Sequence, residues 1–315
     1  MHLAFIGGTR FIGHTAVELA ISRGHRVSVL HRGQHPLEVP GAGEVLVDRG
    51  DPSALSAALG RLRLDVVVDT RAMTRADGET LALALSILGV PAVVLSSQDV
   101  YAQFGRLNGL PAPEPEPVVT ESSPLTIPFP FRELGSHDGG PDYDKKEVEA
   151  ALSVPGLPPV CVLRLPAVYG ARDPRRRLGA IVDRIDRGER VFPCAGAAAW
   201  RHAHAHVRDV ALAILLAAER KPAGFSVFNV AEAEVPSMRE RVESIARHMD
   251  CDIAWQESDE PLAPDLAMLG RMPNDLVTSS ARLREIFGFR ELTSERERAE
   301  DVIASARATR AGTQS

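Results

Sequence analysis

The segment "PDYDKKEVEA", residues 141–150, places a tyrosine beside two lysines. A tyrosine can give or take a proton while a hydride moves, but its unperturbed pKa is about 10, so a nearby ammonium group is needed to favour the phenolate. On a helix, residues i and i+3 are neighbours, whereas i and i+2 face different sides. The spacing therefore predicts that Tyr143 and Lys146 form an acid/base pair and that Lys145 faces away.

Two alternatives remain open for this segment. If the chain enters the helix in a non-helical conformation over residues 141–143, Lys145 can take the place of Lys146. Both lysines could instead form ion pairs on a solvated helix face, with Asp144, Glu147 and Glu149 as the partners.

A second candidate site is the glycine-rich segment "GGTRFIG", residues 7–13. It lies between a buried strand pattern, "LAFIGG", and a helical pattern, "TAVELAISRG", and a second strand pattern, "RVSVLHRG", follows. Gly7 and Gly13 let the backbone N–H groups at a helix N-terminus approach a pyrophosphate without a Cβ in the way. The sequence therefore predicts a dinucleotide site.

The residues near this turn favour NADP over NAD. A site for NAD usually has an acidic residue at the end of the second strand, where it accepts the ribose hydroxyls. This chain has His31 and Arg32 there, and Arg10 lies in the turn itself. Guanidinium groups bind a 2′-phosphate bidentately. We predict NADP as the cofactor and NAD as the second choice; the alternative is that Arg32 is a solvated loop residue.

The same alternation of strand and helix patterns continues along the chain and predicts an α/β fold, a doubly wound parallel Rossmann sheet. We expect an NAD(P)-binding domain over residues 1–170 and a smaller, mostly helical substrate-binding region over 171–315, with 202–230 returning to the first domain. The Pro-rich stretch at 102–142 is predicted to be a long loop, either a lid over the active site or a surface excursion without a role.

Composition limits the other classes of function. The 315 residues carry a net charge of -6 with mixed signs, so nucleic-acid binding is not expected. Three cysteines without metal-ligand spacing, a short apolar start and the lack of an apolar run of about 18 residues predict a cytoplasmic protein without disulfides or a membrane segment. The alternating histidines His202, His204 and His206 would share one face of a strand, but we predict no metal.

Several motifs, taken in order, resemble those of the extended short-chain dehydrogenase/reductase superfamily, the NAD-dependent epimerase/dehydratases. They are "GGTRFIG", "GDPSAL", "SSQDVYA", "VTESSPL", "DYDKKEVE", "LRLPAVYG", "HVRDVALAI" and "FNVAEAE". The arginine in "GGTRFIG" is similar to an atypical branch that includes the chloroplast stem-loop-binding proteins. The resemblance implies an NAD(P)-dependent oxidoreductase or epimerase/dehydratase that acts on a secondary alcohol or carbonyl of a sugar-like or other small molecule, and a homodimer.

The resemblance also implies roles for individual residues. Ser97 and Tyr143 would be catalytic, with Ser97 fixing the substrate oxygen, while Arg201 and Asp99 would bind substrate. The implied cofactor-binding residues are Gly7, Thr9, Arg10, Phe11, Ile12, Gly13, Arg32, Asp51, Thr70, Pro166 and Val168.

Two departures from the family pattern leave the activity and the substrate open. Glu147 stands where the family has its catalytic lysine, and Ala167 stands where many nucleotide-sugar enzymes have asparagine. The alternative function is a non-catalytic NADP-binding sensor or a nucleic-acid-associated protein.

Overall fold

The computed structural model of the chain describes residues 1–126 and 140–313. The strands are β1 (His2–Ile6), β2 (Arg26–His31), β3 (Gly43–Leu46), β4 (Val66–Asp69), β5 (Ala92–Ser97), β6 (Val160–Leu165), β7 (Ala167–Tyr169), β8 (Val191–Cys194), β9 (His204–His206), β10 (Phe225–Asn229) and β11 (Ala254–Glu257). The α-helices are α1 (Phe11–Ser22), α2 (Pro52–Gly60), α3 (Arg75–Leu88), α4 (Ala102–Leu107), α6 (Lys145–Leu152), α7 (Gly179–Asp186), α8 (Val207–Arg220), α9 (Met238–His248), α10 (Ala281–Phe287) and α11 (Glu295–Thr313). Short 3₁₀ turns lie at Gln98–Val100, Gly196–Ala198 and Pro264–Leu269.

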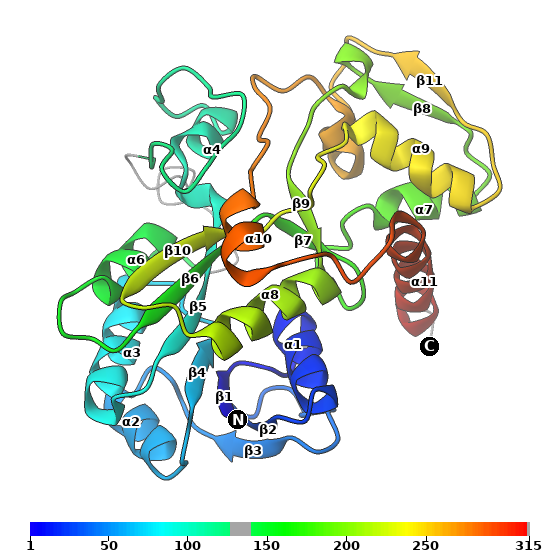
Figure 1. The fold of residues 1–315 in the computed structure, drawn as a ribbon. Coiled ribbons are helices and arrows are strands. Elements are labelled where there is room, and N and C mark those ends of the chain that lie inside the picture. The colour runs from blue at the N-terminus through cyan, green and yellow to red at the C-terminus, as the bar shows by residue number, and fades with distance from the viewer. Residues whose placement is uncertain (127–139, 314–315) are drawn as a thin grey trace.

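A seven-stranded sheet forms the centre of the molecule, in the order β10-β6-β5-β4-β1-β2-β3 (Figure 1). Its neighbouring strands all pair in parallel. The chain adds strands on one side of β1 and then, from β4 onward, on the other, so the strand order reverses between β1 and β4. Open sheets of this kind bind ligands at the carboxyl ends of the strands beside such a reversal. The predicted Rossmann sheet is thereby confirmed.

Helices cover both faces of this sheet, which explains why its strands read as continuous apolar runs. In β1, Leu3 and Phe5 point into one core with α1 and α8, while Ala4 and Ile6 point into the other core with α2, α3 and α6. Figure 1 shows these two layers on opposite sides of the sheet. Successive side chains of a strand alternate between its faces, so both sets must be apolar.

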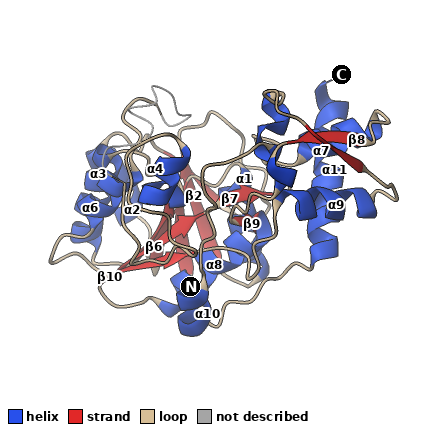
Figure 2. Ribbon diagram, turned by 90° about the horizontal axis from the view of Figure 1, so that it is seen from above, coloured by secondary structure: helices blue, strands red, loops and turns tan. Residues whose placement is uncertain are grey.

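The C-terminal residues divide between the sheet and a second lobe. The helix α8 packs on α1, and β10 pairs with β6 and forms one edge of the sheet. The second lobe contains α7, α9, α11 and the β8-β11 pair, and it has an apolar core of its own (Figure 2). Within the described part of the chain, no helix is long and apolar enough to cross a bilayer.

The stretch predicted as one long loop contains a short helix and several fixed contacts. Residues 102–107 form α4, Tyr101 bridges to Leu125, and Val119 bridges to Thr278. Residues 127–139 lie outside the described part of the chain, so a lid role for this stretch stays a prediction.

We expect Gly78→Val to destabilise the fold, because α3 and α6 approach each other closely at this position. A Cβ on Gly78 would lie 2.9 Å from the Cβ of Ala151 and 3.1 Å from the carbonyl oxygen of Val148. Overpacking of this kind costs about 1–3 kcal/mol. The measurement is the free energy of unfolding in urea. Gly60→Val is the matched control, since the nearest atom to a Cβ there is 4.0 Å away, and an equal loss in both variants would contradict the close approach.

Candidate functional site

A short turn after β4, residues 70–73, is held by a buried carboxylate. Asp69 has no exposed surface, and its Oδ1 accepts the backbone N–H groups of Arg71 (2.7 Å) and Ala72 (2.9 Å). Arg49 donates to both oxygens of Asp69, at 2.8 and 2.9 Å. A buried charge is tolerated only when it is paired and hydrogen-bonded. These contacts therefore fix the conformation of the turn.

The glycine turn packs against this segment. Gly7 has a φ of 80°, and a Cβ there would lie 2.4 Å from Cγ of Arg71 and 2.6 Å from Oγ1 of Thr70. A Cβ on Gly13 would lie 2.9 Å from the Cα of Gly8. Only glycine fits these positions, and the backbone at the start of α1 is left open to a ligand. Thr9, Arg10, Phe11 and Ile12 lie in this turn and the first residues of α1, as a cofactor-binding role requires.

Three exposed arginines gather beside the glycine turn: Arg10, Arg32 and Arg71. Burial of its guanidinium lowers the pKa of Arg71, and the positive charges of Arg10, Arg32 and Arg49 lower it further. Arg49 is neutralised by Asp69 and by Asp77 (3.0 Å). The guanidinium groups of these three arginines make no hydrogen bond or ion pair with any residue that the structure describes. Arg71 was not predicted as a site residue, because only the fold brings it to the turn.

The structure places Lys145, the alternative left open by the sequence, beside the Tyr143 ring, and a catalytic role for Lys146 stays a prediction. The helix α6 begins at Lys145, because Oδ1 of Asp144 caps it by accepting the N–H groups of Lys146 (2.8 Å) and Glu147 (3.2 Å). Tyr143 thus precedes the helix, and the i+3 rule does not apply to it. The ammonium of Lys145 lies 5.9 Å from the centre of the Tyr143 ring, whereas Lys146 donates to the carbonyl oxygen of Thr126.

Lys145 is buried, and its ammonium donates to the carbonyl oxygens of Ala72 and Leu95, the latter at 3.0 Å. Burial lowers its pKa to about 8, while the negative charges of Asp99 and Asp69 oppose that change. The backbone of Asp144 also donates to the carbonyl oxygen of Met73 (2.9 Å). The tyrosine segment and the glycine turn therefore contact the same turn, residues 70–73.

Tyr143 and Asp99 form a buried hydrogen-bonded pair. Their exposed fractions are 5% and 6%, and the Tyr143 hydroxyl donates to Oδ2 of Asp99 at 2.8 Å. Ser97, at the end of β5, accepts the backbone N–H of Asp99 at 3.4 Å, and its hydrogen bond to Tyr143 works to lower the tyrosine pKa. The structure thus brings together Ser97, Asp99 and Tyr143, which were predicted separately.

The pKa values of this pair move in the directions that burial dictates. Burial raises the pKa of Asp99 to about 6, against the hydrogen bond from Tyr143 and the charge of Lys145. Burial and the carboxylate of Asp99 hold the pKa of Tyr143 well above its ordinary value. Tyr143 is therefore a neutral phenol in this arrangement, and not the phenolate expected from a nearby ammonium group.

A buried ion pair fixes α6 against the sheet. Arg164 of β6 donates to Glu149 of α6 through Nε (2.9 Å) and Nη2 (2.6 Å), and Ser96 donates to the same carboxylate at 2.6 Å. Arg164 also donates to the hydroxyl of Tyr101 (3.0 Å). One alternative from the sequence made Glu149 a solvated partner of the lysines, but the structure places Glu149 in the core. Lys145 lies beside the tyrosine.

Three other predicted cofactor residues have structural contacts of their own. Asp51 caps α2, where Oδ1 accepts the N–H groups of Ser53 (2.9 Å) and Ala54 (3.0 Å). Pro166 is buried just before β7, and Val168 packs in the core. Their roles toward a cofactor stay predictions.

The alternating histidines pack against aromatic rings. Trp200 stacks on His202, and the edge of Tyr169 meets both His204 and His206. Burial lowers the pKa of His202 to about 3 and that of His204 well below its ordinary value. Among the residues that the structure describes, no three side chains are grouped to hold a metal ion.

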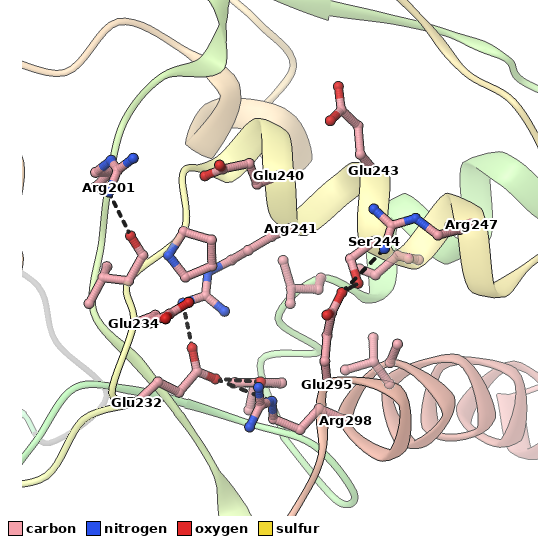
Figure 3. Close-up of a pocket in the computed structure, with 17 residues that line it drawn as sticks. Arg201, Glu232, Glu234, Glu240, Arg241, Glu243, Ser244, Arg247, Glu295 and Arg298 are labelled. Carbon is pink, nitrogen blue, oxygen red and sulfur yellow. Dashed lines mark hydrogen bonds and ion pairs between the residues drawn. The ribbon is translucent and has the colours of Figure 1, made fainter.

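The predicted substrate residue Arg201 lines a cavity of about 610 Å³ between α9, α11 and residues 232–236 (Figure 3). Its floor is the buried pair of Glu232 and Arg241 (2.7 Å), to which the hydroxyl of Tyr169 adds a hydrogen bond (2.6 Å). Ser97, Asp99, Tyr143 and Lys145 do not line this cavity. Arg201 and Tyr143 therefore do not both line this cavity.

Comparison with known proteins supports the resemblance seen in the motifs. Residues 154–231 match the model of the NAD dependent epimerase/dehydratase family. Solved structures of similar fold include the enzyme WbmH of Bordetella bronchiseptica in complex with NAD+, at 19% identity, a TM-score of 0.70 and coverage of 97% of this chain and 98% of that one. No curated protein matches the chain at a significant level.

Two UDP-sugar epimerases have a fold still more like that of this chain. The UDP-glucose-4-epimerase of Stenotrophomonas maltophila, with bound NAD and a formylated UDP-arabinopyranose, has 17% identity and a TM-score of 0.75 and covers 99% of both chains. The UDP-Glc/GlcNAc 4-epimerase of Campylobacter jejuni has 17% identity and a TM-score of 0.74, with coverage of 98% of this chain and 99% of that one. These likenesses confirm the predicted fold, and the family model matches the chain over residues 154–231.

Lys145 is expected to make the protein more stable as the pH rises from about 8 to 10.5. Below this range, folded and unfolded chains both hold the proton, so the folded state bears the full cost of the buried ammonium. Within it, the unfolded chain still binds the proton and the folded chain has released it, so stability increases with pH. The difference between the two pKa values corresponds to roughly 3 kcal/mol.

The measurement is the free energy of unfolding in urea across this range for the wild type and Lys145→Met. The free energy of unfolding of the wild type should increase relative to that of Lys145→Met as the pH rises. Lys146→Met is the matched control for the loss of a lysine from the same helix, because Lys146 is less buried than Lys145. A constant difference between the wild type and Lys145→Met would rule out a buried ammonium at this position.

Proposed function

We propose that the protein is an NADP-dependent oxidoreductase or epimerase/dehydratase that acts on a secondary alcohol or carbonyl of a sugar-like molecule. One observation carries this proposal: Gly7 of the glycine turn packs against residues 70–73, and Asp144 and Lys145, which follow Tyr143 in the chain, donate hydrogen bonds to the same turn. A ligand that lies along this turn has a dinucleotide-type cradle at one end and a proton-transferring hydroxyl at the other.

The residues present fit a nicotinamide dinucleotide. Gly7 and Gly13 let the turn before α1 pack closely on its neighbours, and the dipole at the start of this helix favours the negative charge of phosphate groups. A bound dinucleotide would supply the acceptor or donor of a hydride. The solved neighbours carry NAD, but the unpaired Arg10, Arg32 and Arg71 favour the additional phosphate of NADP in this chain.

Ser97 and Tyr143 are the groups that would hold the reacting substrate oxygen. Ser97 ends β5 and is partly exposed, while the Tyr143 side chain beside it is buried. Lys145 cannot be the usual activating lysine in the usual position, because Glu147 holds that position and the Lys145 ammonium binds two backbone carbonyls. UDP-sugars, which several solved neighbours bind, are the first substrates to test.

NADP+ should raise the melting temperature more than NAD+ at equal concentration, and Arg32→Ala should remove most of this preference. A hydrogen bond to a charged group contributes about 1.5–3 kcal/mol, so we expect a loss of roughly 10- to 100-fold in NADP+ affinity. Arg23→Ala is the control, because Arg23 pairs with Glu219 at the other end of α1. An equal shift by both cofactors would contradict the preference for NADP, and no shift by either would exclude a dinucleotide site.

Tyr143→Phe should reduce the turnover of a UDP-sugar by about 100-fold or more, because the variant lacks the proton-transferring hydroxyl. With UDP-glucose and NADP+ as probes, the measurement is the rate at which epimer or reduced nicotinamide forms. The affinity for NADP+ should stay unchanged in this variant. Turnover at the wild-type rate would exclude Tyr143 as the acid/base, whereas NADP+ binding without turnover in the wild type, with every UDP-sugar tried, would favour a non-catalytic sensor.

A further inference from the structure

The hydrogen bond between Tyr143 and Asp99 has a direction that differs from what a catalytic phenolate would show, because a phenolate has no hydrogen to donate. The Tyr143 hydroxyl donates its hydrogen to Oδ2 of Asp99 at 2.8 Å, and both groups are buried. The hydrogen of the phenol is therefore already engaged. The lone pairs of the phenol oxygen remain the part of the group that can accept a proton from a substrate hydroxyl.

We propose that Asp99 is the final proton acceptor of the site and that Tyr143, as a neutral phenol, relays the substrate proton to it. This assignment rests on the proposed oxidoreductase function and replaces the predicted role of Asp99 in binding substrate. It also explains how the site can work with Glu147 in place of the usual lysine, because a relay through a neutral phenol requires no stabilised phenolate.

The relay conserves atoms and charge. As the alcohol is oxidised, its O–H bond breaks and the proton forms a new O–H bond with the phenol oxygen of Tyr143. The original phenol proton moves to Oδ2 of Asp99, so Tyr143 ends neutral and Asp99 ends as a carboxylic acid. The hydride lost from the carbinol carbon would pass to the oxidised dinucleotide of the proposed function. Reduction of a carbonyl runs through the same bonds in reverse.

The charged groups around the pair are suited to this relay. Lys145 and Asp144, on and before α6, act on Asp99 with opposite charges, and Ser97 donates a hydrogen bond to it from β5. Arg175 acts on Tyr143 from the segment before α7. The raised pKa of Asp99, about 6, lets the carboxyl group take and release a proton in the neutral range, which an ordinary aspartate does less well.

The chain contains an internal control for the proposal. It has three tyrosines, and a second one, Tyr169, also donates to a buried carboxylate, that of Glu232, at 2.6 Å. Burial and Glu232 likewise hold the pKa of Tyr169 well above its ordinary value. The third, Tyr101, donates to the neutral amide of Asn229 at 2.7 Å. With so few tyrosines, their ionisation can be followed one at a time.

The first test is a titration of phenolate absorbance on the intact protein without substrate. Subtracting the Tyr143→Phe spectrum isolates Tyr143, and circular dichroism of the same samples separates ionisation in the folded state from unfolding. Asp99→Asn should move the ionisation of Tyr143 to lower pH, because the phenolate no longer faces a carboxylate. Glu232→Gln should move the ionisation of Tyr169 and leave the ionisation of Tyr143 unchanged. A Tyr143 titration that is the same in Asp99→Asn and the wild type would overturn the proposal.

A second titration, of Asp99 in the Tyr143→Phe variant, tests the same interaction if Asp99→Asn folds poorly. In Tyr143→Phe, the carboxyl group of Asp99, followed by its carbon-13 resonance, should titrate above about 6, because the hydrogen bond that favours the carboxylate is lost. An unchanged titration of Asp99 would show that the two groups do not interact, and the relay would then be wrong.

A kinetic test distinguishes failure of the relay from failure of the proposed function. With UDP-glucose and NADP+, oxidation by the wild type should increase with pH through about 6, and Asp99→Asn should lose about 100-fold or more at every pH. Wild-type turnover in Asp99→Asn overturns the relay and leaves the proposed function standing. If no UDP-sugar is turned over by the wild type while the titrations shift, the proposed function fails, and the pair is an electrostatic coupling without a catalytic role.

Discussion

The buried carboxylate of Asp69 is the contact on which the rest of the candidate site depends. It lies at the end of a central strand, and it is paired with Arg49 and bonded to the backbone of the following turn. Gly7 packs on one side of that turn, and Lys145 and Asp144 bond to its carbonyl oxygens on the other. A single rigid turn thus sets the distance between the cofactor cradle and the acid/base pair, which come from segments about 130 residues apart.

The site concentrates ionisable groups where water cannot reach them. Asp99, Tyr143 and Lys145 are all buried, and each is displaced from its ordinary pKa mainly by the loss of solvent. Such an arrangement costs stability, which the apolar cores on both faces of the sheet and the buried Glu149–Arg164 pair help to offset. In exchange, small changes of charge at one group have large effects on its neighbours, because a low dielectric weakens screening.

The fold and the glycine turn could be predicted because both follow from local patterns. Apolar runs separated by amphipathic helices indicate a parallel sheet, and closely spaced glycines between strand and helix indicate a phosphate cradle. The sequence did not decide between Lys145 and Lys146 as the neighbour of Tyr143, because the answer depends on where α6 begins, and a helix boundary is less certain from sequence than the helix itself. The Asp144 cap was present in the sequence as "YDKKE", an aspartate before a helix with a glutamate three residues later.

Other parts of the site could not be found in this way. The sequence does not show that Arg71 would lie over Gly7, or that the Asp99 side chain would turn toward Tyr143 instead of a substrate. Both depend on contacts between residues far apart in the chain, which periodicity does not report. The buried Asp69 had a weak signal, a charged residue closing the apolar run "DVVVD", which indicates a paired carboxylate but not its partner.

The helix cap at Asp144 has a consequence for how related chains are sorted. A tyrosine that precedes its helix is joined to the buried lysine by a single capping residue, so the two lie two positions apart and the helical repeat plays no part in their spacing. A search that requires tyrosine and lysine four positions apart classes such a chain as a degenerate relative. A search for the tyrosine-aspartate-lysine triplet, combined with an aspartate four residues after the last apolar position of the preceding strand, would instead retain such a chain.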